Sequence, residues 1–316
     1  MDVREELVSV IIPAYNAAAT ITETLESVRA QTYRALDIIV VDDGSSDDTR
    51  ALAEAQAALD PRIRVITQKN GGVAAARNHG LDVSQGAFVA PVDADDLWRP
   101  RKIERQMRAM RAGGPETGLV YCWSAVIDGH GTITSRGGRP VHEGDVLPQL
   151  FVGNFVGNGS CALMRRDLVI EAGGYDPGLR AQRAQGCEDW KLYLLLAERS
   201  LFTVIRDHLV GYRALAGSMS GDAAQMLRSD AIVRAEMLER HPHSIYELDY
   251  GRRFYIDWLI RESLTNRNWQ RASSVLEEKT RDGSVLGRAK ERARLGARFL
   301  KYRLDDRKVF KDIRFM

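Results

Sequence analysis

Short apolar runs alternate with polar and helix-forming stretches over the first third of the chain. Four of these runs are rich in aliphatic and β-branched residues and have the length of strands, at residues 8–12, 36–41, 63–67 and 87–92. Helical patterns lie between them, because Ile21, Leu25 and Val28 recur four and three residues apart, and residues 49–59 and 73–83 are rich in alanine. Strands and helices in this order predict a mainly parallel sheet covered by helices.

The remaining two thirds of the chain are less regular. Residues 113–118 and 128–138 have the composition of loops, residues 151–169 predict an apolar strand that enters a helix, and residues 190–197 predict a buried helix. From Asp222 onward the pattern is helical with few strand signals. We therefore expect a domain boundary near Ser220, with a sheet-containing domain at 1–220 and a helical extension at 221–316.

The composition is that of a folded protein with unevenly placed charge. Apolar residues make up 44% of the 316 residues, enough for a substantial core, and the formal net charge is +2. Residues 286–316 hold eleven basic and four acidic side chains, so the rest of the chain is mildly acidic and the tail favours an anionic partner. The three cysteines are widely spaced without a CxxC pair, which argues against a disulfide framework or a zinc site and fits a reducing cytosol.

Neither a signal peptide nor a membrane span is expected. The N-terminal stretch "MDVREELVSVII" carries acidic residues and no long apolar region. No run approaches the roughly 20 apolar residues of a membrane-spanning helix. We expect a soluble or peripheral protein.

Polar side chains gather where each of the four early strands ends. Asn16 follows the first strand, "DDGSSDD" the second, "QKNGG" the third and "DADD" the fourth. Because ligands of such sheets bind beyond the carboxyl ends of the strands, these four loops predict one site.

The acidic residues of these loops suit cation and hydroxyl binding. Asp93 and Asp95 lie two apart in a turn, where both can face one pocket that holds Mg²⁺ or Mn²⁺, cations that prefer oxygen ligands. The alternative is a solvated acidic turn. Asp43 can accept hydrogen bonds from a base or a ribose, whereas residues 42–46 can instead cap the next helix.

Two further segments carry candidate chemistry. In "NGGVAAARNHG" the glycines and the helix N-terminus favour an anion, and Arg77 suits a diphosphate; the alternative is a glycine turn with a surface arginine. Neither GxGxxG nor GxxxxGK[ST] is present, which argues against a dinucleotide fold and a P-loop. In "CEDWKLYLLL" one carboxylate can act as a general base beside an aromatic platform for a sugar. The alternative is an acidic helix start, with Trp190 in packing.

The order of the motifs "VSVIIPAYNAAATITETLESVRAQTY", "DIIVVDDGSSDDT", "NGGVAAARNHG", "VDADD", "CEDW" and "YRALAGSMS" resembles that of the family 2 glycosyltransferases of bacterial cell-surface polysaccharide type. The resemblance covers about residues 8–220. It implies the GT-A fold, a mainly parallel sheet flanked by helices, here with a C-terminal helical extension. It also implies a nucleotide-sugar half at 1–97 and an acceptor half at 98–220.

The resemblance assigns roles to individual residues. Asp189 matches the catalytic base, with Glu188 and Trp190 on the acceptor side. Asp95 is the better candidate for the metal, which is Mn²⁺ or Mg²⁺, with Asp93 as a second ligand or on the sugar side; Asp96 stays open as a ligand. The residues implied to bind the nucleotide sugar are Pro13, Ala14, Tyr15, Asp43, Asn70, Gly72, Arg77, Asp93 and Ala94.

The implied activity is inverting, metal-dependent transfer of a sugar from a nucleotide-diphosphate donor, by resemblance a UDP-sugar, to a glycan or lipid-linked acceptor. The growing charge on the diphosphate would be offset by the metal and Arg77. A sugar nucleotidyltransferase is one alternative, but "PAYNAAA" lacks the expected glycine- and arginine-rich loop. A non-catalytic sugar-nucleotide binder or membrane scaffold is the other, and it should tolerate loss of Asp95 and Asp189.

The C-terminal segments depart from this pattern or extend it. "YRALAGSMS" has Ala214 and Leu215 where the family often carries a histidine, and nearby His208 is expected to be a surface or satisfied histidine. The basic tail places Leu295, Phe299 and Tyr302 at helical spacing, which suits an anionic membrane surface; the alternative is a helix packed on the catalytic domain. We expect a cytoplasmic protein, peripheral at the inner face of the cell membrane through this tail, and no nucleic-acid partner.

Overall fold

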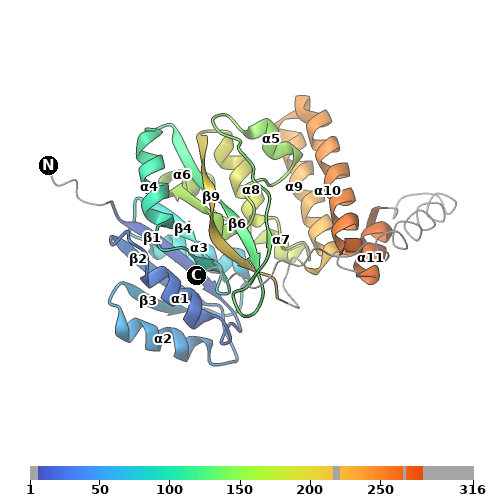
Figure 1. The fold of residues 1–316 in the computed structure, drawn as a ribbon. Helices are drawn as coiled ribbons and strands as arrows, with labels where there is room; N and C mark the ends of the chain where they lie inside the picture. Colours follow the sequence, from blue (N-terminus) through green and yellow to red (C-terminus); the bar gives the residue numbers. More distant parts are fainter. Residues whose placement is uncertain (1–5, 216–220, 266–267, 280–316) are drawn as a thin grey trace.

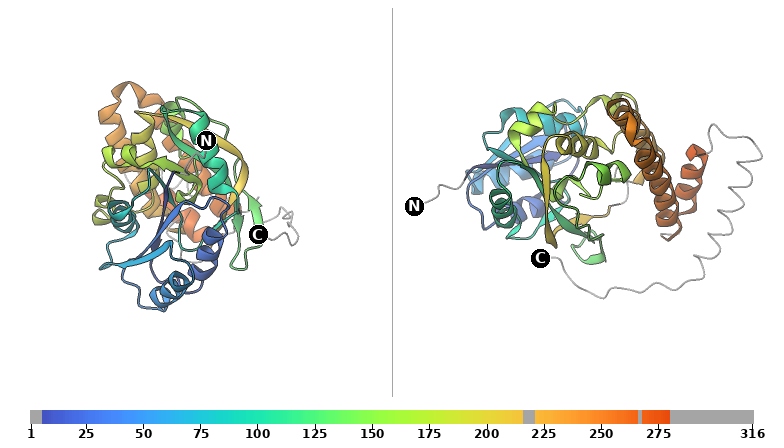
Figure 2. Two further views of the ribbon diagram at one scale, coloured as in Figure 1. Left: turned by 90° about the vertical axis from the view of Figure 1, so that its left-hand side faces the viewer. Right: turned by 90° about the horizontal axis from the view of Figure 1, so that it is seen from above.

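The computed structural model describes residues 6–215, 221–265 and 268–279. Figure 1 shows a twisted sheet flanked by helices, followed by helices that stand together at one end of the molecule. In both views of Figure 2 these last helices lie beside the sheet domain, away from its first strands. The predicted mainly parallel sheet with a helical C-terminal region is confirmed for the described residues.

The first hundred residues fold as their pattern predicts. The strands are β1 (Val8–Ala14), β2 (Leu36–Asp42), β3 (Ile63–Thr67) and β4 (Phe88–Pro91). The helices between them are α1 (Ile21–Arg29), α2 (Thr49–Leu59) and α3 (Val73–Val83). All seven residues of β1 and of β2 are buried, as expected of central parallel strands that are covered on both faces.

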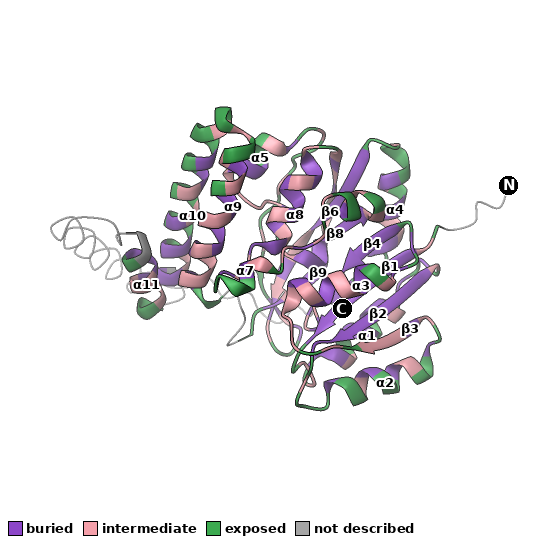
Figure 3. Ribbon diagram, turned by 180° about the vertical axis from the view of Figure 1, so that it is seen from behind, coloured by how far each residue is buried: buried purple, intermediate pink, exposed green. Residues whose placement is uncertain are grey.

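The sheet order places the four early strands side by side as β3-β2-β1-β4, all parallel. Their carboxyl ends therefore share one edge, as predicted. The sheet continues as β8-β6-β9-β5, in which β8 is antiparallel to both β4 and β6, and β6 and β9 are parallel. Figure 3 shows that the strands of the sheet are mostly buried.

The second half of the sheet was predicted poorly. Its strands are β5 (Leu97–Trp98), β6 (Thr117–Ile127), β7 (Ile133–Arg136), β8 (Ala162–Arg165) and β9 (Leu201–Arg213). The expected loop at 128–138 contains β7, and β6 begins inside the expected loop at 113–118. Residues 151–169 hold the end of a helix, then a short strand and a helix, because Gly153 to Gly159 interrupt the apolar run. The predicted strand that enters a helix is present as β8 and α6 (Arg166–Glu171), but the strand begins only at Ala162.

Short and medium helices complete this half. They are α4 (Lys102–Ala112), α5 (Leu147–Val152), α6 (Arg166–Glu171), α7 (Gly178–Ala181) and α8 (Glu188–Ala197). Helix α8 is the buried helix that the sequence predicted, and Leu192, Leu194 and Leu196 on it are fully buried. Its first residues lie among the acidic side chains of the candidate site.

The C-terminal helices are α9 (Ala223–Arg240), α10 (Ile245–Thr265) and α11 (Trp269–Lys279). Arg234 on α9 joins them to the sheet domain, because its guanidinium donates to the carbonyl oxygens of Phe151 (2.6 Å) and Leu248 (2.9 Å). The three helices also share an apolar cluster of their own, made by Leu227, Ile256, Leu259, Ile260, Leu264, Val275 and Leu276.

The predicted boundary near Ser220 stays a prediction, because residues 216–220 lie outside the described residues. The basic tail at 286–316 lies outside them too, so its predicted amphipathic helix is neither seen nor contradicted. Among the helices that the structure does describe, none combines the length and the apolar character that crossing a membrane requires.

Candidate active site

The ends of β1 and β2 are tied together by their loops. The Asn16 side chain accepts hydrogen bonds from the backbone N–H of Ser46 (2.9 Å), and the Asn16 N–H donates to the Ser45 hydroxyl (3.0 Å). Asn16 takes a φ of 49°, which asparagine tolerates better than most residues. Pro13 and Ala14 are buried at the end of β1, whereas the Tyr15 ring is 54% exposed at the sheet edge.

Asp43 organises the start of α3. Its buried carboxylate accepts hydrogen bonds from the backbone N–H groups of Gly71 (2.7 Å) and Gly72 (2.8 Å) and from the amide of Gln68 (2.8 Å). Gly72 takes a φ of +88°, a conformation that favours glycine. In this arrangement Asp43 shapes the turn beside the helix N-terminus and does not cap α2. Its predicted contact with a base stays a prediction.

The remaining residue of that turn reaches α7. The Asn70 side chain accepts a hydrogen bond from Arg180 (2.5 Å), so the turn and α7 lie side by side. On the other side of the site, buried Ala94 is held by its carbonyl, which accepts from the Thr24 hydroxyl of α1 (3.0 Å). Both predicted donor-site residues therefore lie at the strand-end edge.

The three acidic residues of "DADD" have three different environments. Asp96 is fully buried and accepts hydrogen bonds from the Ser160 hydroxyl (2.6 Å), the Asn158 amide (3.0 Å) and the Arg213 backbone N–H (3.0 Å). Burial raises the pKa of its carboxyl well above the ordinary value, with the neighbouring carboxylates adding to the rise. Both of its oxygens are engaged by the protein, so Asp96 has a structural role and is a poor candidate for a metal ligand.

Asp93 and Asp95 are the half-buried members of the turn. Asp93 accepts a hydrogen bond from Arg77 (2.6 Å), and its side chain is 29% exposed. Burial, followed by repulsion from Asp93, raises the pKa of Asp95 to about 6. Asp95 makes no ion pair with another described side chain, so it is the carboxylate best able to accept a cation.

Arg77 connects the acidic turn to the start of α8. Its guanidinium is 3% exposed and donates to Asp93 (2.6 Å) and to Glu188 (3.1 Å), and it lies over the Tyr175 ring at 5.2 Å. A side-chain carbon at Gly159 would lie 2.8 Å from its Nη2, so the close approach depends on glycine. Arg77 is thus neither a surface residue nor an open ligand for a diphosphate. In this structure its donors hold two carboxylates.

Asp189 lies next to this network at the first turn of α8. Its carboxylate is half-buried and accepts a hydrogen bond from the N–H of Trp190 (2.6 Å). Burial, followed by repulsion from Glu188, raises the pKa of Asp189 to about 7, while Arg77 opposes the rise. A carboxyl group with such a pKa can gain or lose a proton near neutral pH, as a general base must.

Trp190 does not offer a platform for a sugar. Its side chain is 3% exposed, its indole N–H donates to the Leu150 carbonyl (3.0 Å), and Arg234 lies over its ring at 4.8 Å. In this structure Trp190 packs between α8, α5 and α9, and the acceptor role predicted for it stays a prediction. Glu188 is also buried, and it accepts from Arg77 and from the Gly186 N–H (3.0 Å), so it orders the start of α8.

Several residues that shape the site were not found from the sequence. Ser160 accepts from the Asp93 N–H and donates to Asp96, and it lies in the short 3-10 turn at Gly159–Cys161, before β8. Arg213 is fully buried, donates to the Asp95 carbonyl (2.7 Å) and pairs with Glu23 (2.6 Å). It lies in the "YRALAGSMS" segment, for which the sequence predicted no role of Arg213.

His208 differs from its prediction as a surface or satisfied histidine. It is half-buried with its ring edge-on to Trp123 at 5.3 Å, and its Nε2 is buried without a hydrogen-bond partner among the described residues. Burial and the nearby arginines Arg136 and Arg139 lower the pKa of its imidazole.

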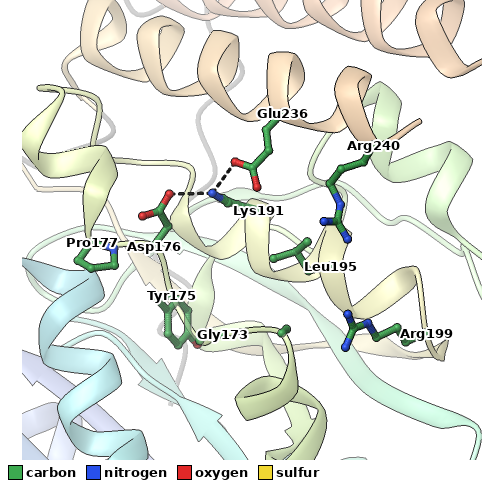
Figure 4. A pocket seen from close by; sticks show the side chains of 11 residues that line it. Gly173, Tyr175, Asp176, Pro177, Lys191, Leu195, Arg199, Glu236 and Arg240 are labelled. Carbon is green, nitrogen blue, oxygen red and sulfur yellow. Dashed lines mark hydrogen bonds and ion pairs between the residues drawn. The ribbon is translucent and has the colours of Figure 1, made fainter. Parts of the chain in front are cut away.

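A polar pocket of about 320 Å³ lies behind the site, between the 172–177 turn, α8 and α9 (Figure 4). Lys191 crosses it, pairing with Asp176 (2.7 Å) from the turn and with Glu236 (2.5 Å) from α9. Arg199 and Arg240 lie near each other at another part of its wall. The two ion pairs of Lys191 join the sheet domain to the C-terminal helices. We therefore interpret the pocket as part of this structural junction.

The comparison with protein families gives the family of this chain. The glycosyl transferase family 2 model matches residues 9–173, just over half of the chain. The chain belongs to glycosyl transferase family 2. The match runs from β1 through the acidic turn and ends before Asp189, so the family resemblance predicted from the sequence is confirmed.

Curated relatives resemble the same region. Glycosyltransferase GlyG of Streptococcus pneumoniae is 41% identical over 100 residues, which are 31% of this chain and 33% of that protein. Chondroitin synthase of Escherichia coli is 35% identical over 150 residues, which are 47% of this chain and 22% of that protein. The matches thus cover a third or less of each of these family 2 relatives.

Solved structures extend the likeness to most of the fold. S. aureus TarS 1–349 in complex with UDP-GlcNAc has a TM-score of 0.63 at 17% identity, covering 86% of this chain and 79% of that one. The mannosyltransferase PcManGT from Pyrobaculum calidifontis, in complex with GDP-Man and Mn²⁺, has a TM-score of 0.62 at 18% identity, covering 95% and 83%. These likenesses confirm the predicted GT-A type of fold.

Proposed function

We propose that this family 2 chain transfers a sugar from a nucleotide-diphosphate sugar to a hydroxyl group of a glycan or lipid-linked acceptor, with inversion at the anomeric carbon. The observation that carries the proposal is the Arg77 bridge, with Asp93 at 2.6 Å and Glu188 at 3.1 Å. It links the acidic turn on the donor side to the residue next to Asp189. A single displacement requires the sugar donor and the base to be held in a fixed position relative to each other.

The proposed base is Asp189. In the reaction, the acceptor oxygen forms a bond to the anomeric carbon as the bond from that carbon to the diphosphate oxygen breaks. The hydroxyl proton passes to the Asp189 carboxylate, and the leaving diphosphate carries away the bonding electrons. The pKa of about 7 suits proton uptake at neutral pH.

Asp95, with Asp93 beside it, would hold the divalent cation. The fit is supported by the half-buried Asp95, whose pKa is raised by burial and then by repulsion from Asp93, and a bound cation would offset both effects. Among the described residues no three His, Cys, Asp or Glu side chains form a metal-binding group, which suits a cation that takes further ligands from diphosphate and water. When bound, Mn²⁺ or Mg²⁺ supplies positive charge against the leaving diphosphate.

The donor and acceptor classes are supported by the relatives. TarS was solved with UDP-GlcNAc and PcManGT with GDP-Man, so a nucleotide-diphosphate sugar is the expected donor, and UDP is our first choice. Chondroitin synthase is named for making a glycan, which favours a polysaccharide acceptor. The exposed Tyr15 and the ordered Gly71–Gly72 turn would face the nucleotide at the strand-end edge.

The experiment that tests the proposal is calorimetric binding of UDP, GDP, ADP and CDP, each with Mn²⁺ and with a chelator. We expect one nucleotide to bind with an affinity that the chelator reduces. Asp95→Ala should bring the affinity with Mn²⁺ down to the chelator value, whereas Asp82→Asn, at an exposed position on α3, should change nothing. Binding of no nucleotide under any condition would contradict the proposal and favour a scaffold.

A further inference from the structure

Helix α10 carries a row of exposed aromatic side chains that nothing in the proposed reaction uses. Four aromatic residues recur at every fourth position, and their exposed fractions are 83% for Tyr246, 56% for Tyr250, 48% for Phe254 and 45% for Trp258. Residues four apart lie on the same face of a helix. Figure 3 shows exposed residues along α10 on the side away from the sheet. Large contiguous apolar surfaces of this kind mark interaction sites.

A row of charges runs beside the aromatic row. Each charged residue follows an aromatic one by three positions and is exposed, and the signs alternate along Asp249, Arg253, Asp257 and Arg261. Within the helix, Arg253 pairs with Asp249 at 2.7 Å, and both side chains stay mostly exposed. Because the signs alternate over four positions, the same row on a second helix that runs in the opposite direction carries the opposite sign at every matching position.

We propose that α10 is a dimer interface in which two copies of the chain pack their α10 helices antiparallel about a two-fold axis near Tyr255. In that register Asp249 faces Arg261 of the second copy, and Arg253 faces Asp257 of the second copy. The two-fold axis repeats both pairs, so all eight charges of the two rows meet an opposite charge. A self-complementary surface of this kind is the signature of an isologous interface.

The same register also interleaves the aromatic rows. With a rise of about 1.5 Å per residue, Trp258 of one helix falls midway between Tyr250 and Phe254 of the other. The two Phe254 residues lie on either side of the two-fold axis, about 3 Å apart along the helix direction. One register therefore satisfies the charges and the aromatic spacing together, although the two patterns are independent features of the sequence.

The charges argue for a second copy over an anionic membrane surface. The exposed face of α10 carries Glu247, Asp249 and Asp257 beside two arginines, so it offers no net attraction to anionic lipids. Opposite charges at matched positions instead fix the partner and the direction of packing.

The test is a charge-exchange cycle in the full chain, read by sedimentation equilibrium over a concentration series. Arg253→Asp alone and Asp257→Arg alone each place like charges opposite one another twice per dimer, and we expect each to raise the dimer dissociation constant by on the order of tenfold or more. The double variant restores both pairs and should bring the constant back toward the wild-type value. The combined change Tyr250→Ala and Phe254→Ala should give a monomer.

Circular dichroism spectra and thermal unfolding of each variant separate loss of association from loss of folding. A wild-type chain that stays monomeric at the highest concentration would overturn the proposal. So would single charge variants that associate as the wild type does, or a double variant no better than the singles. Binding of the monomer to vesicles of phosphatidylcholine and phosphatidylglycerol, abolished by the two alanine changes, would assign the surface to membranes instead.

Discussion

Replacing Asp189 by Asn tests whether this carboxylate is held near neutrality by its surroundings. Asparagine has nearly the same shape, keeps the oxygen that accepts the Trp190 N–H, and cannot ionise. In the wild type, burial and the neighbouring Glu188 raise the pKa of Asp189 from 3.8 to about 7. The folded state therefore retains a proton that the unfolded state has already lost between these two pH values.

The sign and the size of the effect follow from this difference. Because the folded state binds more protons, the free energy of unfolding falls as the pH rises through the interval and levels off above the folded-state pKa. From about pH 5.5 to about 7 the loss amounts to roughly 2 kcal/mol at about 1.4 kcal/mol per pH unit. The Asn variant lacks this loss. The free energy of unfolding of the variant minus that of the wild type should therefore increase by about 2 kcal/mol as the pH rises from about 5.5 to 8.5.

Urea unfolding at these two pH values measures the change, with Asp82→Asn as the matched control at an exposed position. In the same preparations, wild-type transfer should decline about tenfold per pH unit below about pH 7, since the base must be ionised, and the Asn variant should lose about 10²–10⁴-fold in kcat. An equal pH dependence of stability in both proteins would refute the raised pKa. Undiminished transfer by the variant would remove Asp189 as the base.

Three other changes test the network around it. Arg77→Met leaves Asp93 and Glu188 without their cation and should cost about 3–5 kcal/mol of unfolding free energy in urea titrations, with Arg77→Lys less harmful; a cost under about 1 kcal/mol would contradict the buried bridge. Asp95→Ala should raise the melting temperature in chelator at neutral pH, because it removes a carboxylate that is ionised at a cost in the folded state, and it should abolish the further rise that Mn²⁺ induces; a retained Mn²⁺-induced rise would move the cation elsewhere. Lys191→Met, at a partly exposed double ion pair, should cost only about 1 kcal/mol, and a cost of several would show that the junction to α9 depends on it.

The parallel part of the sheet was predictable because its local signals agree. Its strands are short, apolar and separated by helices of strong propensity, and α2 and α3 begin and end at the predicted residues. In a parallel sheet the carboxyl ends of the strands share one edge, and this rule placed the four polar loops together. The acidic turn, Asp43 and Asn16 could therefore be assigned to one site without coordinates.

The acceptor half could not be predicted for a physical reason. Strand β6 pairs with β8, β9 and the short β7, partners that lie from about 10 to 80 residues away, so tertiary contacts decide its extent. The register of β6 with β9 also shifts at Cys122 to Ser124, which no local pattern signals. For the same reason Ser160 and Arg213, which reach the acidic turn from this half, went unnoticed.

Arg77 and Trp190 lie in environments that the sequence did not predict. Both were expected to meet a ligand, and both are 3% exposed. A motif gives the residue type and its place at the sheet edge, but not whether neighbours consume its hydrogen bonds. The partner that engages Arg77 from α8, Glu188, lies 111 residues further along the chain, so no local pattern signals the pair.

The distribution of charge explains how three carboxylates in four residues are tolerated. Asp96 is buried with hydrogen bonds to both oxygens and a raised pKa, and Asp93 is paired with Arg77. Asp95 is half-buried and makes no ion pair with another described side chain, so it is the member of the cluster that we propose as the cation ligand. Arg77 also holds Glu188, the neighbour of the proposed base Asp189. Arg77 thus contacts the neighbours of both the proposed cation ligand and the proposed base. Replacing Arg77 should therefore disturb both functions at once.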